Sequence, residues 1–193
     1  FRESHPNGSR PLSALIRAGI AHIYFESIHP YEDGNGRLGR ALVDKVLSQA
    51  LGQPSMLMLA DAIEKRRKDY YYQLGEASLS NQLDEWLQWF GQVVLDAQKS
   101  TYRHLSFLLA KGKFMQKYQS KLNERQKKVL LRIFREGPNG FEGGLSAKNY
   151  QRITGASPAT ATRDLNALVE LGALRKTGAQ KSTRYWLILP DTN

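Results

Sequence analysis

The chain has 193 residues, of which 41% are hydrophobic and 24% are charged, and this globular mix argues against wholesale disorder. No apolar run approaches the about 18 residues of a membrane span, the polar start does not resemble a signal peptide, and the absence of cysteine excludes disulfides and thiolate chemistry. We therefore expect a cytoplasmic protein without a membrane partner.

The charge is divided unevenly along the chain. Residues 1–110 hold 12 Lys and Arg against 12 Asp and Glu, whereas residues 111–193 hold 16 against 6 and so carry the whole net charge of +10. Such a division suggests two units with different partners. A basic unit of this size is a candidate nucleic-acid binder, because its cations can neutralise phosphates, although a merely solubilising surface would show the same charge.

The first half is predicted to be all helical. A helix is expected over 12–28, because apolar residues recur there at three- and four-residue steps, and Pro30 ends it. The recurring residues are Leu12, Leu15, Ile16, Ile20, Ile23 and Ile28. A polar loop over 31–36 follows. Further helices are expected over 36–51, 61–77, 83–97 and about 99–121.

The second half of the chain is predicted to contain shorter helices, a glycine-rich loop and two strands. A helix over 124–135 is followed by a glycine-rich loop over 137–144, a short helix from Ser146 to Ile153, and a tight turn at Gly155–Ser157. Ser157 and Pro158 then start a helix that runs to Leu171. Two strands are expected over 173–176 and 184–189, with a basic tip over 178–183 between them.

Helix, helix, turn, helix and β-hairpin in this order are typical of a winged helix-turn-helix domain. We expect it over 122–190, after a domain over 1–105 and a linking helix over 106–121. In that geometry the third helix would reach base edges with Ser157, Ala159, Thr160, Thr162, Arg163 and Asn166. The hairpin would bring Lys176, Lys181 and Arg184 to phosphates. Protein docking or homodimerisation is the alternative use of this domain.

The strongest functional signal is the segment from His29 to Arg40, HPYEDGNGRLGR, which we call the signature loop. Gly34, Asn35 and Gly36 can present backbone N–H groups at a helix N-terminus, which favours anions. Arg37 and Arg40 are three residues apart and can share a helix face toward a polyphosphate.

Two further side chains of the loop fit the same chemistry. Asp33 can hold Mg²⁺ together with phosphate oxygens, and His29 can take a proton from an attacking hydroxyl. These are the parts that phosphoryl or nucleotidyl transfer needs.

Three other interpretations of the loop fit less well. Gly34, Gly36 and Gly39 match the spacing of a dinucleotide-binding fingerprint, but that motif follows a strand and a helix is expected here. A Walker A loop needs Gly-Lys-Ser/Thr, which is absent. A capped helix–loop–helix joint with an incidental histidine would not account for twelve residues in this order.

The signature loop resembles the H-x-F-x-[D/E]-G-N-G-R-x-x-R signature of the Fic family, with Tyr31 in place of the usual phenylalanine. The resemblance covers roughly residues 10–100 and extends to Arg66–Tyr71 and to Trp86-x-x-Trp89-Phe90. It implies a mainly α fold, the C-terminal portion of a Fic-type helical bundle, followed here by the winged helix-turn-helix domain with its small β-hairpin. Fic domains followed by a winged helix form a known arrangement.

The resemblance also implies an activity and roles for individual residues. The activity is protein adenylylation: AMP passes from ATP to a Ser, Thr or Tyr hydroxyl of a target protein or of the protein itself, and pyrophosphate leaves. By position, His29 would be the general base and Asp33 the Mg²⁺ ligand. Gly34, Asn35 and Gly36 would form the anion hole, Arg37 and Arg40 would hold the β- and γ-phosphates, and Tyr70 would lie near the nucleoside. Ser78 falls where an adenine-contacting asparagine is common.

Two parts of the family pattern are missing. No pair of alternating strands precedes the loop to form the target-positioning flap, and Glu136 and Glu142 do not fit the inhibitory [S/T]-x-x-x-E-[G/N] motif. The chain also starts without methionine. We therefore expect a fragment that lacks the N-terminal half of its Fic domain and alone has weak or no activity.

Two alternatives to AMP transfer stay open. The same site could remove AMP or transfer another phosphate-containing group, because the loop indicates phosphate handling and not the leaving group. Alternatively, the protein could be a DNA-binding regulator whose Fic part senses nucleotide.

Overall fold

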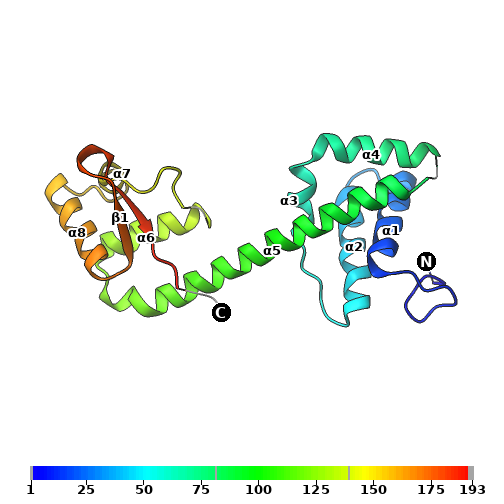
Figure 1. The fold of residues 1–193 in the computed structure, drawn as a ribbon, viewed down its shortest axis with the longest axis horizontal. Helices are drawn as coiled ribbons and strands as arrows, with labels where there is room; N and C mark the ends of the chain where they lie inside the picture. The colour runs from blue at the N-terminus through cyan, green and yellow to red at the C-terminus, as the bar shows by residue number, and fades with distance from the viewer. Residues whose placement is uncertain (1, 81, 139, 191–193) are drawn as a thin grey trace. The chain divides into compact units, whose positions relative to one another are not determined.

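The computed structural model describes residues 2–80, 82–138 and 140–190 and is mainly helical, with one two-stranded antiparallel hairpin near the end of the chain (Figure 1). This confirms the predicted mainly α class with a small hairpin. The chain forms two compact units, Phe1–Tyr102 and Arg103–Asn193. The expected domain limits at 105 and 121 stay predictions.

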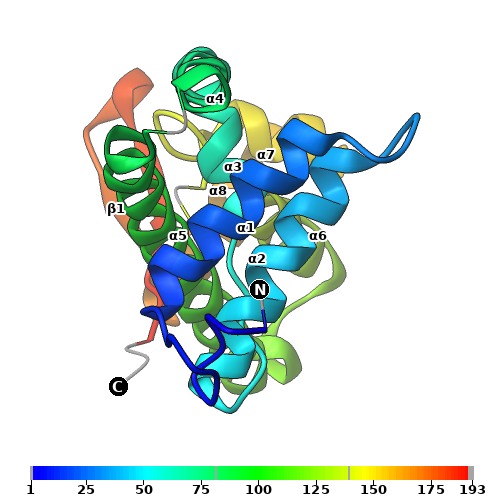
Figure 2. The same ribbon diagram turned by 90° about the vertical axis from the view of Figure 1, so that its right-hand side faces the viewer.

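Unit 1 is built around a pair of antiparallel helices, α1 (Ala14–Ile28) and α2 (Asn35–Leu51), which lie side by side in Figure 2. Ser13 caps α1, because its side chain accepts a hydrogen bond from the N–H of Ile16 at 3.4 Å. Gly52 ends α2 in the left-handed conformation, with φ 66°. The turn that joins the two helices contains the start of the signature loop.

The buried face of α1 does not coincide with the apolar pattern from which the helix is predicted. Four of the six residues that recur in the apolar pattern are exposed, namely Leu12, Leu15, Ile16 and Ile28. The buried residues of α1 are the small Ala18, Gly19 and Ala21 together with Arg17, His22 and Ile23. A Cβ at position 19 would crowd Leu87 and Phe90 of the neighbouring helix, and the Gly19 carbonyl accepts a hydrogen bond from Trp86 Nε1 at 2.9 Å. Close approach between helices therefore decides which face is buried here.

Two helix boundaries also differ from the prediction. The expected helix over 61–77 is two helices, α3 (Leu59–Glu64) and α4 (Arg67–Ser80). They are separated by a tight turn, in which the N–H of Arg66 donates to the carbonyl of Ile63, three residues earlier, at 2.9 Å. The expected helices over 83–97 and 99–121 are one helix, α5 (Asp84–Tyr118), followed by a short turn of 3₁₀ helix, η1 (Gln119–Lys121). Along α5 the composition changes from aromatic to basic without a proline, so nothing breaks the helix.

Among the described helices, none combines the length and the apolar composition that crossing a bilayer requires.

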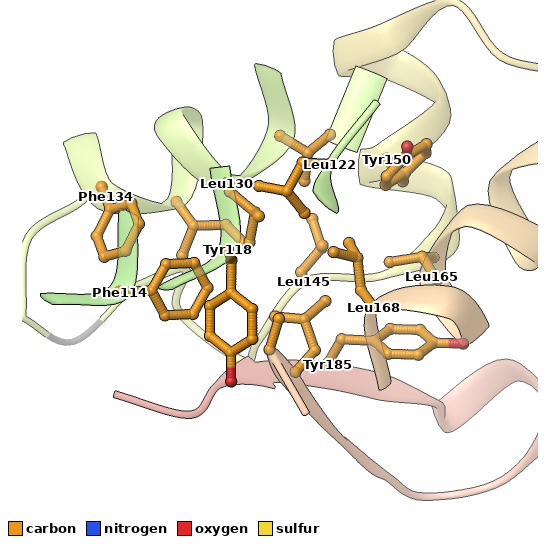
Figure 3. Packing of buried hydrophobic residues seen from close by; sticks show 14 of the residues in the cluster. Phe114, Tyr118, Leu122, Leu130, Phe134, Leu145, Tyr150, Leu165, Leu168 and Tyr185 are labelled. Atoms are coloured by element: carbon orange, nitrogen blue, oxygen red, sulfur yellow. The ribbon is translucent and has the colours of Figure 1, made fainter. Parts of the chain in front are cut away.

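Unit 2 contains three further helices and the hairpin, in the predicted order. The elements are α6 (Glu124–Arg135), α7 (Ala147–Thr154), α8 (Pro158–Glu170), β1 (Leu174–Thr177), η2 (Gln180–Ser182) and β2 (Arg184–Leu187). Leu174 pairs with Leu187 across the antiparallel hairpin, and Leu145 forms an isolated antiparallel bridge to Tyr185. Figure 3 shows the core between these elements, with Leu145, Leu165 and Leu168 close together.

Local signals start the helices of unit 2 where the sequence predicts. The Ser146 and Ser157 side chains accept hydrogen bonds from the N–H groups of Asn149 and Thr160, and Pro158 occupies the first position of α8. Asn123 and Gln126 form a capping box at the start of α6.

A buried carboxylate links the three helices of unit 2. Asp164 of α8 accepts hydrogen bonds from Arg125 Nε of α6 at 2.8 Å, from Tyr150 Oη of α7 at 2.9 Å, and from Asn123 Nδ2 at 3.2 Å. Burial by itself raises the pKa of Asp164, but these hydrogen bonds outweigh burial and hold the pKa below its ordinary value. Asp164 therefore fixes the direction in which α8 presents its exposed face.

Candidate functional site

A cleft of about 590 Å³ lies between the end of α1, the first turns of α2, and the segment from α3 to α4. His29, Gly36, Arg40 and Tyr70 all line this cleft, so the structure brings together four of the residues singled out from the sequence. The volume lies within the about 300–1,000 Å³ range of small-molecule sites. The cleft beside the signature loop is therefore large enough for a small molecule.

His29 stands at the rim of this cleft in a specific backbone conformation. It is the C-cap of α1, with φ 47° and ψ 58°, and its N–H donates to the Phe25 carbonyl at 3.0 Å. Left-handed backbone is uncommon for residues other than glycine, and among those residues histidine is one of the more tolerant. The helix therefore ends at the residue whose exposed imidazole borders the cleft.

Asn35 shapes the signature loop from within. Its side chain is buried with only 3% of the residue exposed, accepts a hydrogen bond from the N–H of Tyr31 at 3.1 Å, and donates to the Tyr31 carbonyl. These two bonds close the loop over residues 31–35. The Asn35 side chain thus holds the loop, and Asn35 is not among the residues that line the cleft.

Asp33 already lies on the N-terminus of α2. One oxygen accepts the N–H of Gly34 at 2.6 Å, and the other lies 3.2 Å from Arg37 Nη2. The side chains of Asp33 and Arg37 are 93% and 75% exposed, so this ion pair contributes little stability and can open. In this structure the Asp33 carboxylate takes the place next to the Gly34 N–H where an anionic ligand was expected.

The two arginines of the loop occupy different places. Arg40 lines the cleft together with Gly36, and a Cβ at position 36 would come within 3.3 Å of Arg40 Nη1, so glycine leaves space for the guanidinium. Arg37 is not among the lining residues and contacts Asp33 instead. In this geometry Arg40 lines the cleft and Arg37 does not, and the binding of a polyphosphate by the two arginines stays a prediction.

Several lining residues were given no role from the sequence. They are Glu26 of α1, Asp61 and Glu64 of α3, and Arg67 and Tyr71 of α4. Only Glu26 carried a local signal, because it lies three residues before His29 and so shares its helix face. The others enter the cleft through the packing of α3 and α4, which the sequence pattern does not describe.

The base of the cleft is aromatic and buried. Tyr70 packs against Trp86 and Trp89, with ring centroids 6.4 and 5.9 Å away, and its Oη lies 3.1 Å from His22 Nε2. Burial raises the pKa of Tyr70, and the nearby Glu26 charge adds to the effect. The phenol therefore stays protonated and can donate a hydrogen bond.

Ser78, at the position where the family resemblance suggests a contact to adenine, lies elsewhere. Its Oγ is 2.9 Å from Ser27 Oγ and donates to the Leu74 carbonyl at 2.7 Å, and Ser78 is not among the residues that line the cleft. It links α4 to α1 in this structure.

Cationic, acidic and aromatic side chains lie together in the cleft. Arg40 and Arg67 supply guanidinium groups, and Tyr71 supplies an aromatic face that Arg67 approaches at 6.0 Å from the ring centroid. Among the described residues no three His, Asp or Glu side chains group to hold a metal. Mg²⁺ fits on Asp33 only together with phosphate oxygens and water, which is its usual mode beside nucleotides.

Comparison with known families identifies the segment that carries this geometry. Residues 2–47 match the model of the Fic/DOC family. The matched segment contains α1, the whole signature loop and most of α2, so the family resemblance is confirmed for this part of the chain.

A solved structure is also similar to this chain. It is a Fic family protein from Desulfovibrio desulfuricans G20, with 22% sequence identity and a TM-score of 0.45. The match covers 92% of this chain and 50% of that chain, so this chain spans about half the length of the protein that it matches.

In unit 2 the structure divides the predicted nucleic-acid contacts into two groups. Ser157 Oγ donates to Thr160 Oγ1, Thr162 Oγ1 donates to the Pro158 carbonyl, and Arg184 Nη1 donates to the Lys181 and Thr183 carbonyls, so these side chains have structural bonds. Ser157 and Thr162 are nevertheless exposed, as are the remaining predicted residues: Ala159, Arg163 and Asn166 on α8, Lys176 on β1, and Lys181 on the hairpin tip.

Proposed function

We propose that unit 1 carries the catalytic loop of a protein adenylyltransferase, which moves AMP from ATP to a hydroxyl of a target protein or of the protein itself. The observation that carries this proposal is the cleft that places His29, Gly36, Arg40 and Tyr70 around one space of nucleotide size. The Fic/DOC match over residues 2–47 supports the same assignment. A phosphate-handling site needs cations, backbone donors and a base in one place, and this cleft has all three.

In the proposed reaction His29 accepts the proton of the target hydroxyl. The hydroxyl oxygen forms a bond to the α-phosphorus of ATP, while the bond from that phosphorus to the oxygen of the leaving pyrophosphate breaks. The products are an AMP ester of the target and pyrophosphate, and the proton stays on His29 until water removes it. Mg²⁺, when bound, would neutralise phosphate charge beside Asp33.

The other cleft residues act before this step. Arg40 and the Gly36 backbone hold phosphates, and Tyr70 bounds the nucleoside. Because the Gly34 N–H and Arg37 are bonded to Asp33 here, phosphate and metal binding requires the Asp33 carboxylate to turn away from them. Removal of AMP, or transfer of another phosphate-containing group, would use the same residues and differ in its products.

The mass of the full-length protein and of added target proteins tests this proposal after incubation with ATP and Mg²⁺. We expect an AMP-sized gain that disappears in His29→Ala and persists in His104→Ala, which changes an exposed histidine of α5. Calorimetry should show that His29→Ala still binds ATP. A phosphate-sized gain, or a gain that survives His29→Ala, would contradict the proposal.

We propose as a second function that unit 2 binds nucleic acid through α8 and the hairpin. Residues 111–193 carry the whole net charge of +10, and Arg163, Asn166, Lys176 and Lys181 are exposed on consecutive elements. Cations on a helix that follows a tight turn, next to a basic hairpin, fit a groove and its flanking phosphates. A docking surface for protein, including a second copy, is the alternative outcome.

Fluorescence anisotropy of labelled duplex DNA tests the second function at several salt concentrations. We expect binding that weakens steeply with salt and that is unaffected by His29→Ala. Absence of binding at low salt, together with concentration-dependent dimerisation, would assign the surface to protein contact instead.

A further inference from the structure

A buried histidine lies beneath the cleft and contacts one of its walls. His22 of α1 is 0% exposed, stacks on Trp86 with ring centroids 5.9 Å apart, and has its Nε2 3.1 Å from Tyr70 Oη. Burial lowers the pKa of His22 to about 4, so the imidazole is neutral near pH 7. A neutral imidazole has one donor nitrogen and one acceptor nitrogen.

Two buried polar atoms next to His22 have no hydrogen-bond partner in the structure. They are His22 Nδ1 and Glu26 Oε1, on residues four apart and therefore on one face of α1. Both face the same point of α2: a Cβ at Gly39 would overlap Glu26 Oε1 and would lie 3.1 Å from His22 Nδ1. Buried polar atoms are almost always paired in native proteins, and here a potential donor and an acceptor meet in the space that glycine leaves open.

We infer that Tyr70, His22 and Glu26 form one hydrogen-bonded chain under the cleft. Tyr70 O–H donates to His22 Nε2, and His22 Nδ1–H donates to the Glu26 carboxylate, directly or through one water beside Gly39. The opposite tautomer would place the Nδ1 lone pair against the carboxylate, so two acceptors would face each other. Burial lowers the pKa of His22, and a smaller opposing effect comes from the backbone of Gly39, which therefore also interacts with this imidazole.

The two ends of this chain are walls of the cleft. Tyr70 and Glu26 both line it, and burial raises the pKa of Glu26 more than the nearby His29 and Arg40 lower it. We therefore assign His22 and Glu26 as positioning residues that fix the Tyr70 ring and the carboxylate before the ligand enters. This role, unlike the hydrogen-bonded chain itself, rests on the proposed nucleotide-binding function.

The NMR resonances of the His22 imidazole test the proposed hydrogen-bonded chain without any ligand. In ¹⁵N-labelled protein we expect the Nδ1–H tautomer, a His22 signal that does not titrate near neutral pH, and a shifted Nδ1–H resonance in Glu26→Gln. The exposed His104 serves as the control imidazole. A His22 ring that carries its proton on Nε2, or an Nδ1–H resonance that Glu26→Gln leaves unchanged, would overturn the inference.

Nucleotide affinity tests the positioning role. We expect Tyr70→Phe and Glu26→Gln each to weaken ATP binding by about tenfold, and the double variant to lose little more than either alone, because the residues act as one unit. Tyr72→Phe, an exposed neighbour, is the matched control and should bind as the wild type does.

Gly39→Ala should reproduce the weakened binding, because its methyl group displaces the Glu26 carboxylate. Gly75→Ala, at a helical glycine with open space, should not. Fully additive losses would overturn the positioning role. If the wild type binds no nucleotide, the proposed function fails. The tautomer measurement still shows whether the hydrogen bonds between Tyr70, His22 and Glu26 exist.

Discussion

Replacing Asp164 with asparagine should destabilise unit 2 while keeping the shape of the side chain. The Asp164 side chain is 6% exposed and accepts bonds from Arg125, Tyr150 and Asn123. Asparagine has no charge and presents an NH₂ group toward at least one of these donors. The substitution therefore leaves a buried donor without an acceptor.

The expected loss of stability in Asp164→Asn depends on how exposed the partners of Asp164 are. Breaking a buried ion pair by removing one partner destabilises a protein by about 3–5 kcal/mol. Because the Arg125 side chain is 43% exposed, water can solvate its charge after the substitution. We therefore expect the lower end of the range, about 3 kcal/mol, which corresponds to roughly a hundredfold change in an opening equilibrium.

Hydrogen exchange measured by mass spectrometry reports the change in the opening equilibrium for each unit separately. Amides of α6 and α8 should exchange roughly a hundredfold faster in Asp164→Asn, while those of α1 and α2 stay unchanged. Glu170→Gln, which removes an exposed charge from the same helix, is the matched control. An increase below about threefold, or one equal to that of Glu170→Gln, would refute the role assigned to Asp164.

The same carboxylate gives unit 2 a pH dependence. The folded-state pKa of Asp164 is depressed, so its stabilisation is fully present above the unfolded-state pKa of about 3.9 and is lost as the pH falls through the folded-state value. Acid unfolding of wild-type unit 2 should therefore steepen below about pH 4. Asp164→Asn should lose this contribution, and an unchanged acid profile would contradict the assignment.

Three further changes test other parts of the account. Arg40→Ala should weaken ATP binding about tenfold more than AMP binding in calorimetry, because Arg40 is assigned to the outer phosphates, and equal losses would contradict that assignment. Glutamine at both Lys176 and Lys181 should lower the salt slope of DNA binding by about 2, and an unchanged slope would place the DNA elsewhere. Asp96→Asn removes the half-exposed pair with Arg66 and should cost about 1 kcal/mol, seen as faster exchange in α4, whereas unaltered exchange would show that the pair contributes nothing.

Local signals allowed the helices of unit 2 to be predicted closely. Ser146, Ser157 and Pro158 act on the backbone within one turn, so their effect is visible in the sequence. The buried face of α1 was not predictable in this way. It depends on the close approach of α5 to Gly19, whereas the pattern of large apolar residues points to a face that is exposed.

The candidate site likewise contains residues that the sequence indicates and residues that only the folded structure reveals. The signature loop is one contiguous segment, so its residues could be named from the sequence. His22 became visible only through Gly39 and Tyr70, because these neighbours lie on α2 and α4. That Asp33 would bond to the Gly34 N–H and Arg37 also depends on the folded loop, since spacing alone allowed both arginines to face a ligand.

The most direct test of the central claim uses ATP labelled on either the α- or the γ-phosphate. The full-length protein is incubated with Mg²⁺ and target proteins, beside its His29→Ala variant, and label bound to protein is measured. The account predicts that protein gains the α-label and not the γ-label, and that His29→Ala abolishes the gain. Label from the γ-phosphate, or α-label that survives in His29→Ala, would contradict AMP transfer by this loop.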